Sequence, residues 1–323
     1  MNLPDPRLAV VIPCFRVEAQ ILGVIAAIGP EVQAIYVVDD ACPEQSGALV
    51  ERSCSDARVR VLRHAQNRGV GGAVLTGYQA ALADGADIVI KLDGDGQMDP
   101  ALIAALVHPI RSGEADYCKG NRFHQLSDVA AMPALRLFGN AALSFLTKLS
   151  SGYWQSFDPT NGFTAIHRAA LRRLPLDRVA RRYFFESDLL FHLNQVRAVV
   201  CDFPMRAHYA DEHSSLSPLR MILPFLRGHL RNFTRRILYS YFIRGFSLAS
   251  LELLLGCLAV LFGTVFGSLA WVESLRSAQT ASAGTVMVSA LPIILGMQML
   301  LSWLNFDVAA EPRIALNRLF GRD

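Results

Sequence analysis

The chain has 323 residues and a formal net charge of +3 at pH 7, with 52% hydrophobic and 18% charged residues. The low share of charge excludes an intrinsically disordered chain, and the mild net charge gives no case for nucleic-acid binding. The mean hydropathy of +0.30 is too high for an ordinary soluble enzyme, so we expect part of the chain to meet lipid.

Cysteine usage and the N-terminal stretch both indicate a cytosolic front half. The six cysteines include no CxxC pair and no histidine partner at zinc-binding spacing, so we expect reduced and mostly buried thiols. The apolar run near the N-terminus is too short for the hydrophobic region of a secretory signal peptide.

The first half of the chain alternates short Val- and Ile-rich runs with stretches of helical periodicity. The runs predict strands at residues 8–13, 34–39, 59–63, 87–92 and 115–119, and the periodic stretches predict helices at 18–28, 46–53, 70–83 and 100–112. This alternation is typical of a parallel sheet with crossover helices. Such sheets bind ligands beyond the carboxyl ends of their strands, so we expect the polar residues found there to share one pocket.

The most specific chemical signal is Asp93-Gly94-Asp95-Gly96-Gln97, directly after the fourth predicted strand. Two carboxylates one residue apart can bind one hard divalent cation such as Mg²⁺ or Mn²⁺, which they share with substrate phosphates. An EF-hand is excluded because Met98 and Ala104 stand in place of its glycine and its last glutamate. The alternative is a solvated turn, but the place beside Asp39 and Asp40 favours a metal site.

A glycine-rich stretch, Asn67-Arg68-Gly69-Val70-Gly71-Gly72, follows the third predicted strand and opens the next helix. It is not a Walker loop, and it lacks the last glycine of the dinucleotide-binding fingerprint. Two interpretations stay open: the glycines allow close approach to a nucleotide pocket, or they allow the helix to pack on the sheet.

Two long apolar runs in the last third of the chain are predicted to cross a membrane. Residues 246–270 contain one charged residue, Glu252, and residues 285–306 contain none. About 20 apolar residues span the hydrocarbon core of a bilayer as a helix. The alternative is a pair of buried helices in a soluble domain, but such helices rarely stay apolar on every side.

The connector at residues 271–284 is short, so we expect an antiparallel hairpin with both ends on one side of the membrane. Arginines precede and follow the hairpin: Arg220, Arg227, Arg231, Arg235, Arg236 and Arg244 before it, and Arg313, Arg318 and Arg322 after it. The positive-inside rule places both ends in the cytoplasm. The sequence therefore predicts a multi-pass protein of the cytoplasmic (inner) membrane whose front domain lies in the cytoplasm.

Residues 218–245 alternate arginines with apolar side chains, which predicts basic amphipathic helices in the headgroup layer, broken at Pro224 and Gly228. The alternative is a linker helix packed on the domain. The predicted organisation is a cytosolic domain at 1–217, juxtamembrane helices at 218–245, and a hairpin with a short tail at 246–323. A two-helix anchor is compatible with a homo-oligomer, for which Gly263 and Gly267 form the sole candidate small-residue pair.

Seven motifs occur in the order found in family 2 inverting glycosyltransferases: VVIPCFRVE, VVDDACPE, NRGVGGAVLTGYQAAL, KLDGDGQMDP, KGNRF, DPTNGF and FFESDLL. Over about residues 7–217 the chain resembles the polyprenyl-phosphate branch of that family, which includes dolichol-phosphate mannose synthase. The resemblance implies an α/β glycosyltransferase A fold with a Rossmann-like mixed sheet. It also implies metal-dependent, inverting transfer of a hexose from a nucleotide sugar to a polyprenyl phosphate, with Mg²⁺ or Mn²⁺ as cofactor.

The resemblance implies roles for individual residues as well. The nucleotide would be bound by Pro13, Phe15, Glu18, Asp39, Asp40 and Asp93, and the metal by Asp93, Asp95 and Gln97. The acceptor phosphate would be held by Arg122, Arg136, His213 and Ser214, and the catalytic acids would be Asp95, Glu186 and Asp188. Val17 stands where the family often has a glutamate, which makes Glu18 the neighbouring candidate for that contact.

The nature of the acceptor sets the roles of Glu186 and Asp188. A phosphate acceptor is anionic near neutral pH and needs no strong base, so these acids would orient groups or balance charge. With a hydroxyl acceptor, one of them would be the general base. Two alternatives stay open: glycosyl transfer to another membrane lipid or a saccharide, and a catalytically inactive membrane scaffold.

Overall fold

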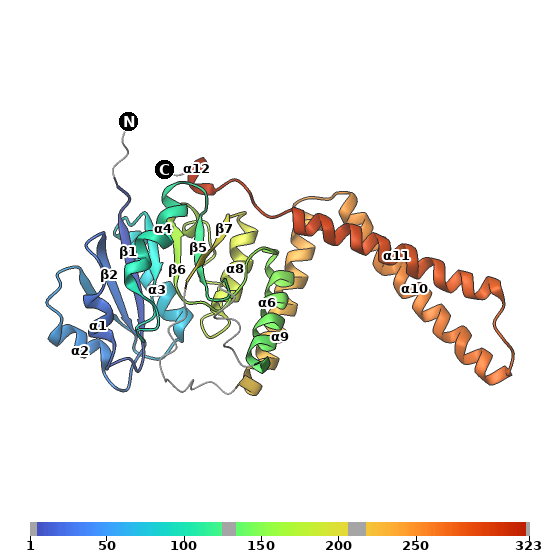
Figure 1. Cartoon of the computed structure of the whole chain (residues 1–323), viewed down its shortest axis with the longest axis horizontal. Coiled ribbons are helices and arrows are strands. Elements are labelled where there is room, and N and C mark those ends of the chain that lie inside the picture. Colours follow the sequence, from blue (N-terminus) through green and yellow to red (C-terminus); the bar gives the residue numbers. More distant parts are fainter. Residues whose placement is uncertain (1–4, 125–133, 206–217, 321–323) are drawn as a thin grey trace. The chain divides into compact units, whose positions relative to one another are not determined.

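Figure 1 shows the computed structural model of the chain, which describes residues 5–124, 134–205 and 218–320. The chain forms two compact units. The first comprises Met1–Phe233 together with Pro312–Asp323, and the second comprises Thr234–Glu311. The chain therefore leaves the first unit, builds the second and returns to the first.

The first unit contains a seven-stranded sheet in the order β3-β2-β1-β4-β6-β5-β7. Its strands are β1 (Leu8–Cys14), β2 (Val32–Asp39), β3 (Val59–Arg63), β4 (Ile88–Lys91), β5 (Tyr117–Asn121), β6 (Thr164–His167) and β7 (Val200–Pro204). Strands β1 to β4 pair in parallel, as predicted. Strand β6 runs antiparallel to both β4 and β5, so the sheet is mixed.

Helices cover both faces of this sheet (Figure 1). One face packs against α3 (Val70–Ala83), α7 (Arg168–Leu171) and α8 (Phe185–Gln195). The other packs against α1 (Ile21–Ala26), α2 (Ser46–Ser53) and α4 (Ile103–Arg111), which follows the 3-10 helix η1 (Pro100–Leu102). Successive strand residues alternate between the faces, so Val10 and Ile12 join one core and Val11 the other.

The sequence pattern does not predict strands β6 and β7. They have four and five residues, and β7 has no fully buried position, so neither produces a long apolar run. Strand β5 begins two residues later than predicted. Just before it, the carboxylate of Asp116 accepts backbone N–H groups from Val199, Leu316 and Asn317.

Helix α9 (Pro218–Ile237) is continuous, so the predicted breaks at Pro224 and Gly228 are wrong. A side chain at Gly228 would overlap the ring of Phe184, so the glycine allows close packing. The buried residues His229 and Asn232 hold the helix on the first unit, together with α6 (Ala134–Ser151), and this packing outweighs the cost of a helical proline.

The second unit is a helical hairpin of α10 (Leu248–Ser277) and α11 (Ala283–Ala309), which run side by side in Figure 1. Within the described ranges, these two helices are long and apolar enough to cross a membrane. Only 11% and 6% of their most apolar stretches are buried. Large apolar side chains exposed on every side are unlike the core helices of a soluble domain, and they suggest membrane association.

Small residues hold the hairpin together. Gly263 and Gly267 of α10 face Ser289 of α11, whose hydroxyl donates to the Gly263 carbonyl at 3.0 Å. The predicted small-residue pair is therefore used within the hairpin. Glu252 also has an internal partner, since Ser302 Oγ donates to its Oε1 at 2.9 Å.

A buried polar cluster lies where the π-helix η2 (Leu238–Ile243) meets the hairpin. Arg236 donates to both carboxylate oxygens of Asp307, at 2.6 and 3.0 Å, and the Tyr241 hydroxyl donates to Asp307 Oδ1 at 2.6 Å. Arg236 and Asp307 are each only 3% exposed. Because each charge has its partner, this cluster joins the end of α9 to α11 without a buried unpaired charge.

Candidate active site

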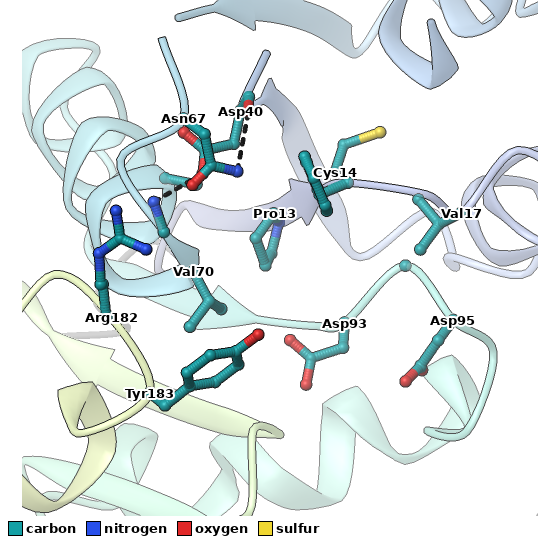
Figure 2. Close-up of a pocket in the computed structure, with 14 residues that line it drawn as sticks. Pro13, Cys14, Val17, Asp40, Asn67, Val70, Asp93, Asp95, Arg182 and Tyr183 are labelled. Carbon is teal, nitrogen blue, oxygen red and sulfur yellow. Dashed lines mark hydrogen bonds between the residues drawn. The ribbon is translucent and has the colours of Figure 1, made fainter. Parts of the chain in front are cut away.

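A pocket of about 360 Å³ lies beyond the carboxyl ends of β1 to β4 (Figure 2). Four strand ends and a segment before α8 form its wall. The residues that line it are Pro13, Cys14, Phe15, Val17, Asp40, Asn67, Gly69, Val70, Ala73, Asp93, Gly94, Asp95, Arg182 and Tyr183. Five predicted site residues, Pro13, Phe15, Asp40, Asp93 and Asp95, therefore meet in one cavity.

Asp93 and Asp95 point into the pocket from the loop after β4 (Figure 2). Gly94 separates them, and a side chain there would press on the packed residues Ile12, Val17 and Ile21. The backbone N–H of Gln97 donates to Asp95 Oδ1 at 3.0 Å, while Gln97 itself does not line the pocket. Gln97 thus shapes the loop through its backbone.

Lys91 at the end of β4 joins the two acidic motifs. Its ammonium is buried and donates to Asp93 Oδ1 at 2.8 Å and to the Gly162 carbonyl at 3.2 Å, and it lies 3.3 Å from Glu186 Oε1. Burial alone would lower the pKa of Lys91, but the Asp93 and Glu186 carboxylates outweigh it and raise the pKa above its usual value. A side chain at Gly162 would overlap both Asp93 and Lys91, so this glycine makes room for the cluster.

Glu186 belongs to this cluster and does not line the pocket. Burial raises its pKa above the usual value, and the Lys91 ammonium opposes that effect. Lys91 opens the motif KLDGDGQMDP, but the sequence assigns it no role. A lysine inside the apolar run Ile88–Lys91 is the signal that could have identified it, because a charge in a buried strand needs a partner.

Asp188 is fully buried and holds three segments together. Its Oδ2 accepts the backbone N–H of Ala180 at 2.7 Å, and its Oδ1 accepts from Asn232 at 2.7 Å and from Arg231 at 3.2 Å. The structure therefore places Asp188 between α8 and α9, away from the pocket. Its contacts position the segment before α8.

Asp39 and Asp40 differ in their surroundings. Asp39 is buried behind the pocket, where its Oδ1 accepts the backbone N–H of Cys42 at 2.8 Å. Asp40 reaches the pocket, but its Oδ1 accepts the N–H of Arg68 at 2.8 Å and its Oδ2 accepts that of Gly69 at 2.7 Å. Its Oδ1 also lies 2.7 Å from His64 Nδ1. The carboxylate of Asp40 thus shapes the glycine-rich turn.

Two further predicted site residues, Glu18 and Arg122, are not brought to the pocket. Glu18 is exposed and does not line it. Arg122 forms a two-point ion pair with Asp158 at 2.7 Å for each contact. Burial alone would raise the pKa of Asp158, but Arg122 outweighs it and the pKa lies below the usual value. The predictions for His213, Ser214 and the side chain of Arg136 lie outside the described residues.

The glycine-rich turn packs against the segment at residues 180–185. Gly72 donates its backbone N–H to the Arg181 carbonyl at 2.9 Å. A side chain at Gly69 would overlap this carbonyl and the Arg182 side chain, and one at Gly71 would overlap Ala180 and Phe185. Neither interpretation from the sequence is complete, because the glycines admit a segment more than 100 positions away. That segment brings Arg182 and Tyr183, which no motif indicates, to the pocket.

The chain matches the model of the Glycosyl transferase family 2 over residues 9–174, which is half of its length. It therefore belongs to this family and is a glycosyltransferase, as the motifs predict. Helices α9 to α12 lie beyond the matched residues.

Two relatives have names that contain dolichyl phosphate or polyprenol monophosphomannose. The UDP-N-acetylglucosamine–dolichyl-phosphate N-acetylglucosaminyltransferase of Methanococcus voltae is 28% identical over 223 residues, which are 65% of this chain and 88% of that protein. The polyprenol monophosphomannose synthase of Mycolicibacterium smegmatis is 30% identical over 192 residues, or 58% of this chain and 71% of that protein. The chain thus resembles the polyprenyl-phosphate branch.

A solved structure confirms the expected glycosyltransferase A fold. It is glucosyl-3-phosphoglycerate synthase from Mycobacterium tuberculosis, in complex with Mn²⁺, uridine diphosphate and phosphoglyceric acid. The TM-score is 0.52 at 20% identity, and the match covers 72% of this chain and 78% of that one. At this identity the likeness concerns the fold.

Proposed function

We propose that this glycosyltransferase moves a hexose from a nucleotide sugar to a polyprenyl phosphate at the cytoplasmic face of a membrane, with inversion and with Mg²⁺ or Mn²⁺. The observation that carries the proposal is the shared pocket of Asp93, Asp95, Pro13 and Phe15. It joins two metal-binding carboxylates to the strand ends where α/β sheets bind nucleotides.

The pocket residues in the loop after β4 fit a divalent cation. Asp93 and Asp95 offer hard oxygen ligands, and Lys91 occupies one oxygen of Asp93. Among the described residues, no group of three or more His, Cys, Asp or Glu side chains forms a metal site. The remaining ligands would therefore be donor phosphates and water, as is usual for Mg²⁺. When bound, the cation neutralises charge on the leaving diphosphate.

The chain's own residues orient the reactants. Pro13 and Phe15 present an apolar surface to the nucleoside, and the Lys91 ammonium holds Asp93 and Glu186 in one arrangement. An anionic acceptor phosphate attacks without losing a proton, so no free general base is needed. Glu186, paired with Lys91, then balances charge, in keeping with its position outside the pocket.

The lipid acceptor is supported by the two relatives named for dolichyl phosphate and polyprenol, and by the apolar hairpin. The outer side of α9 adds exposed Leu223, Leu226 and Leu230 beside arginines, a combination suited to anionic headgroups. Both connections to the hairpin start from the first unit, at Phe233 and Pro312. We place both ends of the hairpin on one side of the membrane, and by the positive-inside rule the flanking arginines favour the cytoplasmic side.

A transfer assay tests the proposal. Full-length protein in detergent receives radiolabelled nucleotide sugars and either undecaprenyl or dolichyl phosphate, with Mn²⁺ or with EDTA. We expect lipid-linked product with Mn²⁺ and its loss with EDTA. Diacylglycerol and a saccharide serve as competing acceptors, and product on these alone would refute the lipid-phosphate assignment.

Asp95→Asn tests the proposed metal site in the same assay. We expect the rate of transfer to fall by at least about a hundredfold. Asp99→Asn is the matched control. Asp99 is exposed four residues further on and accepts the backbone N–H of Ala101, outside the pocket. Equal activities of the two variants would remove the metal assignment.

A further inference from the structure

The pocket has a direction, set by the order of the strands. Asp93 and Asp95 follow β4, whereas Asn67 and Gly69 follow β3, and β1 and β2 lie between these strands. At a strand spacing of about 4.8 Å, the two ends of the pocket are roughly 14 Å apart. A donor whose diphosphate is held at Asp93 and Asp95 therefore extends its nucleoside past Pro13 and Asp40 towards the β3 end.

Asp40, the predicted nucleotide-binding carboxylate at this end of the pocket, is already engaged. Asp40 accepts the N–H groups of Arg68 and Gly69 and contacts His64. Asn67 donates its side-chain amide to the Asp40 carbonyl at 3.3 Å. The group that reads the base must come from elsewhere in the wall.

Arg182 lies at this end, across the pocket from Asp95 (Figure 2). It is the one cationic side chain among the described residues that line the pocket. The fold fixes the position of Arg182, because its side chain packs against Gly69. A Cβ atom at position 69 would overlap the Arg182 side chain. The preceding carbonyl, that of Arg181, accepts the Gly72 N–H.

The Arg182 guanidinium is available to a ligand. Within residues 5–124, 134–205 and 218–320, no ion pair engages it, unlike Arg122 with its carboxylate partner. A guanidinium only donates hydrogen bonds, in a planar fork. It therefore favours a base edge that presents a carbonyl oxygen and disfavours one that presents an amino group.

We infer that Arg182 is the specificity-determining residue for the donor base, and that it selects a base with a ring carbonyl at the position where cytosine and adenine carry an amino group. The base is thus uracil or a 6-oxopurine such as guanine. This inference rests on the proposed donor site, and it concerns the choice of base within that site.

Two matched nucleotide pairs test it by calorimetry on the full-length protein with Mn²⁺. UDP and CDP differ in the substituent at position 4 of the ring, and IDP and ADP differ in the substituent at position 6. We expect the native protein to prefer the carbonyl member of one pair by roughly ten- to a hundredfold. Arg182→Met should bring that ratio close to one, and Arg182→Lys should restore part of it.

Arg181→Met is the control. It removes the same charge from the neighbouring residue, whose side chain does not line the pocket. It should keep the native preference. A native protein that binds both members of each pair equally well overturns the inference and leaves the proposed function standing. Equal weakening of both members by Arg182→Met also overturns it, because that result indicates a general electrostatic role. Absence of any nucleotide binding by the native protein would refute the donor site itself.

Discussion

At the scale of single residues, Lys91 is the centre of the candidate active site. Its ammonium has three oxygen partners, from Asp93, Glu186 and Gly162, so all three of its N–H groups are used. The Asp93-Gly94-Asp95 motif and Glu186 in the first turn of α8 therefore belong to one charge cluster. Neither motif alone shows that the carboxylates of Asp93 and Glu186 share the Lys91 ammonium.

We predict that Lys91→Met weakens Mn²⁺-dependent nucleotide binding by about ten- to a hundredfold, because Asp93 loses the partner that orients it. Lys119→Met is the matched control: Lys119 is also buried and pairs with Asp202 at 3.1 Å, away from the pocket. Both variants should lower the melting temperature, since each leaves a carboxylate unpaired. Electron paramagnetic resonance titration of Mn²⁺ separates them, and equal losses of binding would contradict the positioning role of Lys91.

His229 gives a pH dependence of stability. It is buried near Ser150 and Phe184, and burial lowers its pKa to about 4 from 6.5, against a smaller opposing effect of Asp188. Between pH 6.5 and about 4 the unfolded chain therefore binds a proton that the folded chain does not. The folded state should lose on the order of 3 kcal/mol as the pH falls through this window, with full stability kept above it.

Thermal unfolding at pH 7.5, 5.5 and 4.5 measures this loss. His229→Gln should flatten the decline, whereas the exposed-site control His108→Gln should leave it as in the native protein. Parallel pH profiles for all three proteins would show that another group controls acid stability.

At the scale of elements, the local sequence pattern explains where the first strands and helices form, whereas long-range packing explains some of the residues within them. Strands β1 to β4 are predicted well because each is a run of buried Val and Ile, which is a property of neighbouring residues. The start of α3 is also predicted, but the reason for its glycines is not. That reason is the 180–185 segment, which is distant in sequence and contacts the turn in the folded structure.

We predict that Gly71→Ala lowers stability by about 1 to 3 kcal/mol and weakens nucleotide binding, because its new methyl group displaces the segment that carries Arg182. Gly139→Ala in α6 is the control, since, apart from the neighbouring backbone of α6 itself, no atom of the described residues lies within 4 Å of the added methyl. It should raise stability by about 0.5 to 1 kcal/mol through helix propensity. Denaturant unfolding and calorimetric titration measure the two effects, and unchanged binding in Gly71→Ala would refute the coupling.

At the scale of the whole molecule, the chain returns to its first unit after the hairpin. The buried carboxylate of Asp116 accepts the backbone N–H groups of Val199, Leu316 and Asn317 at 2.8 to 2.9 Å. Leu316, in α12 (Leu316–Phe320), joins the core of the sheet. Residues 312–320 are thus part of the glycosyltransferase unit, whereas the sequence predicts them as a tail of the hairpin.

We predict that Asp116→Ala lowers stability by about 3 kcal/mol and exposes the chain around Pro312 to proteases, since three buried N–H groups lose their acceptor. The exposed neighbour Glu114 supplies the control Glu114→Ala, which should change neither property. Limited proteolysis followed by mass spectrometry locates the cleavage. If proteases cleave Asp116→Ala near Pro312 no faster than the native protein, other contacts hold the C-terminal segment.

The sequence by itself determined the family, the first four strands, the DxD loop and the apolar hairpin, because each depends on residues close together in the chain. Only the tertiary structure decided which acids face the pocket. Asp93 and Asp95 do, whereas Asp39 and Asp188 are enclosed by backbone N–H groups and neighbouring side chains. It also decided that Arg182 lies in the pocket and that Lys91 joins two acidic motifs. Such contacts join residues far apart in sequence, and burial, which sets their charge and geometry, exists only once the sheet and its helices have packed.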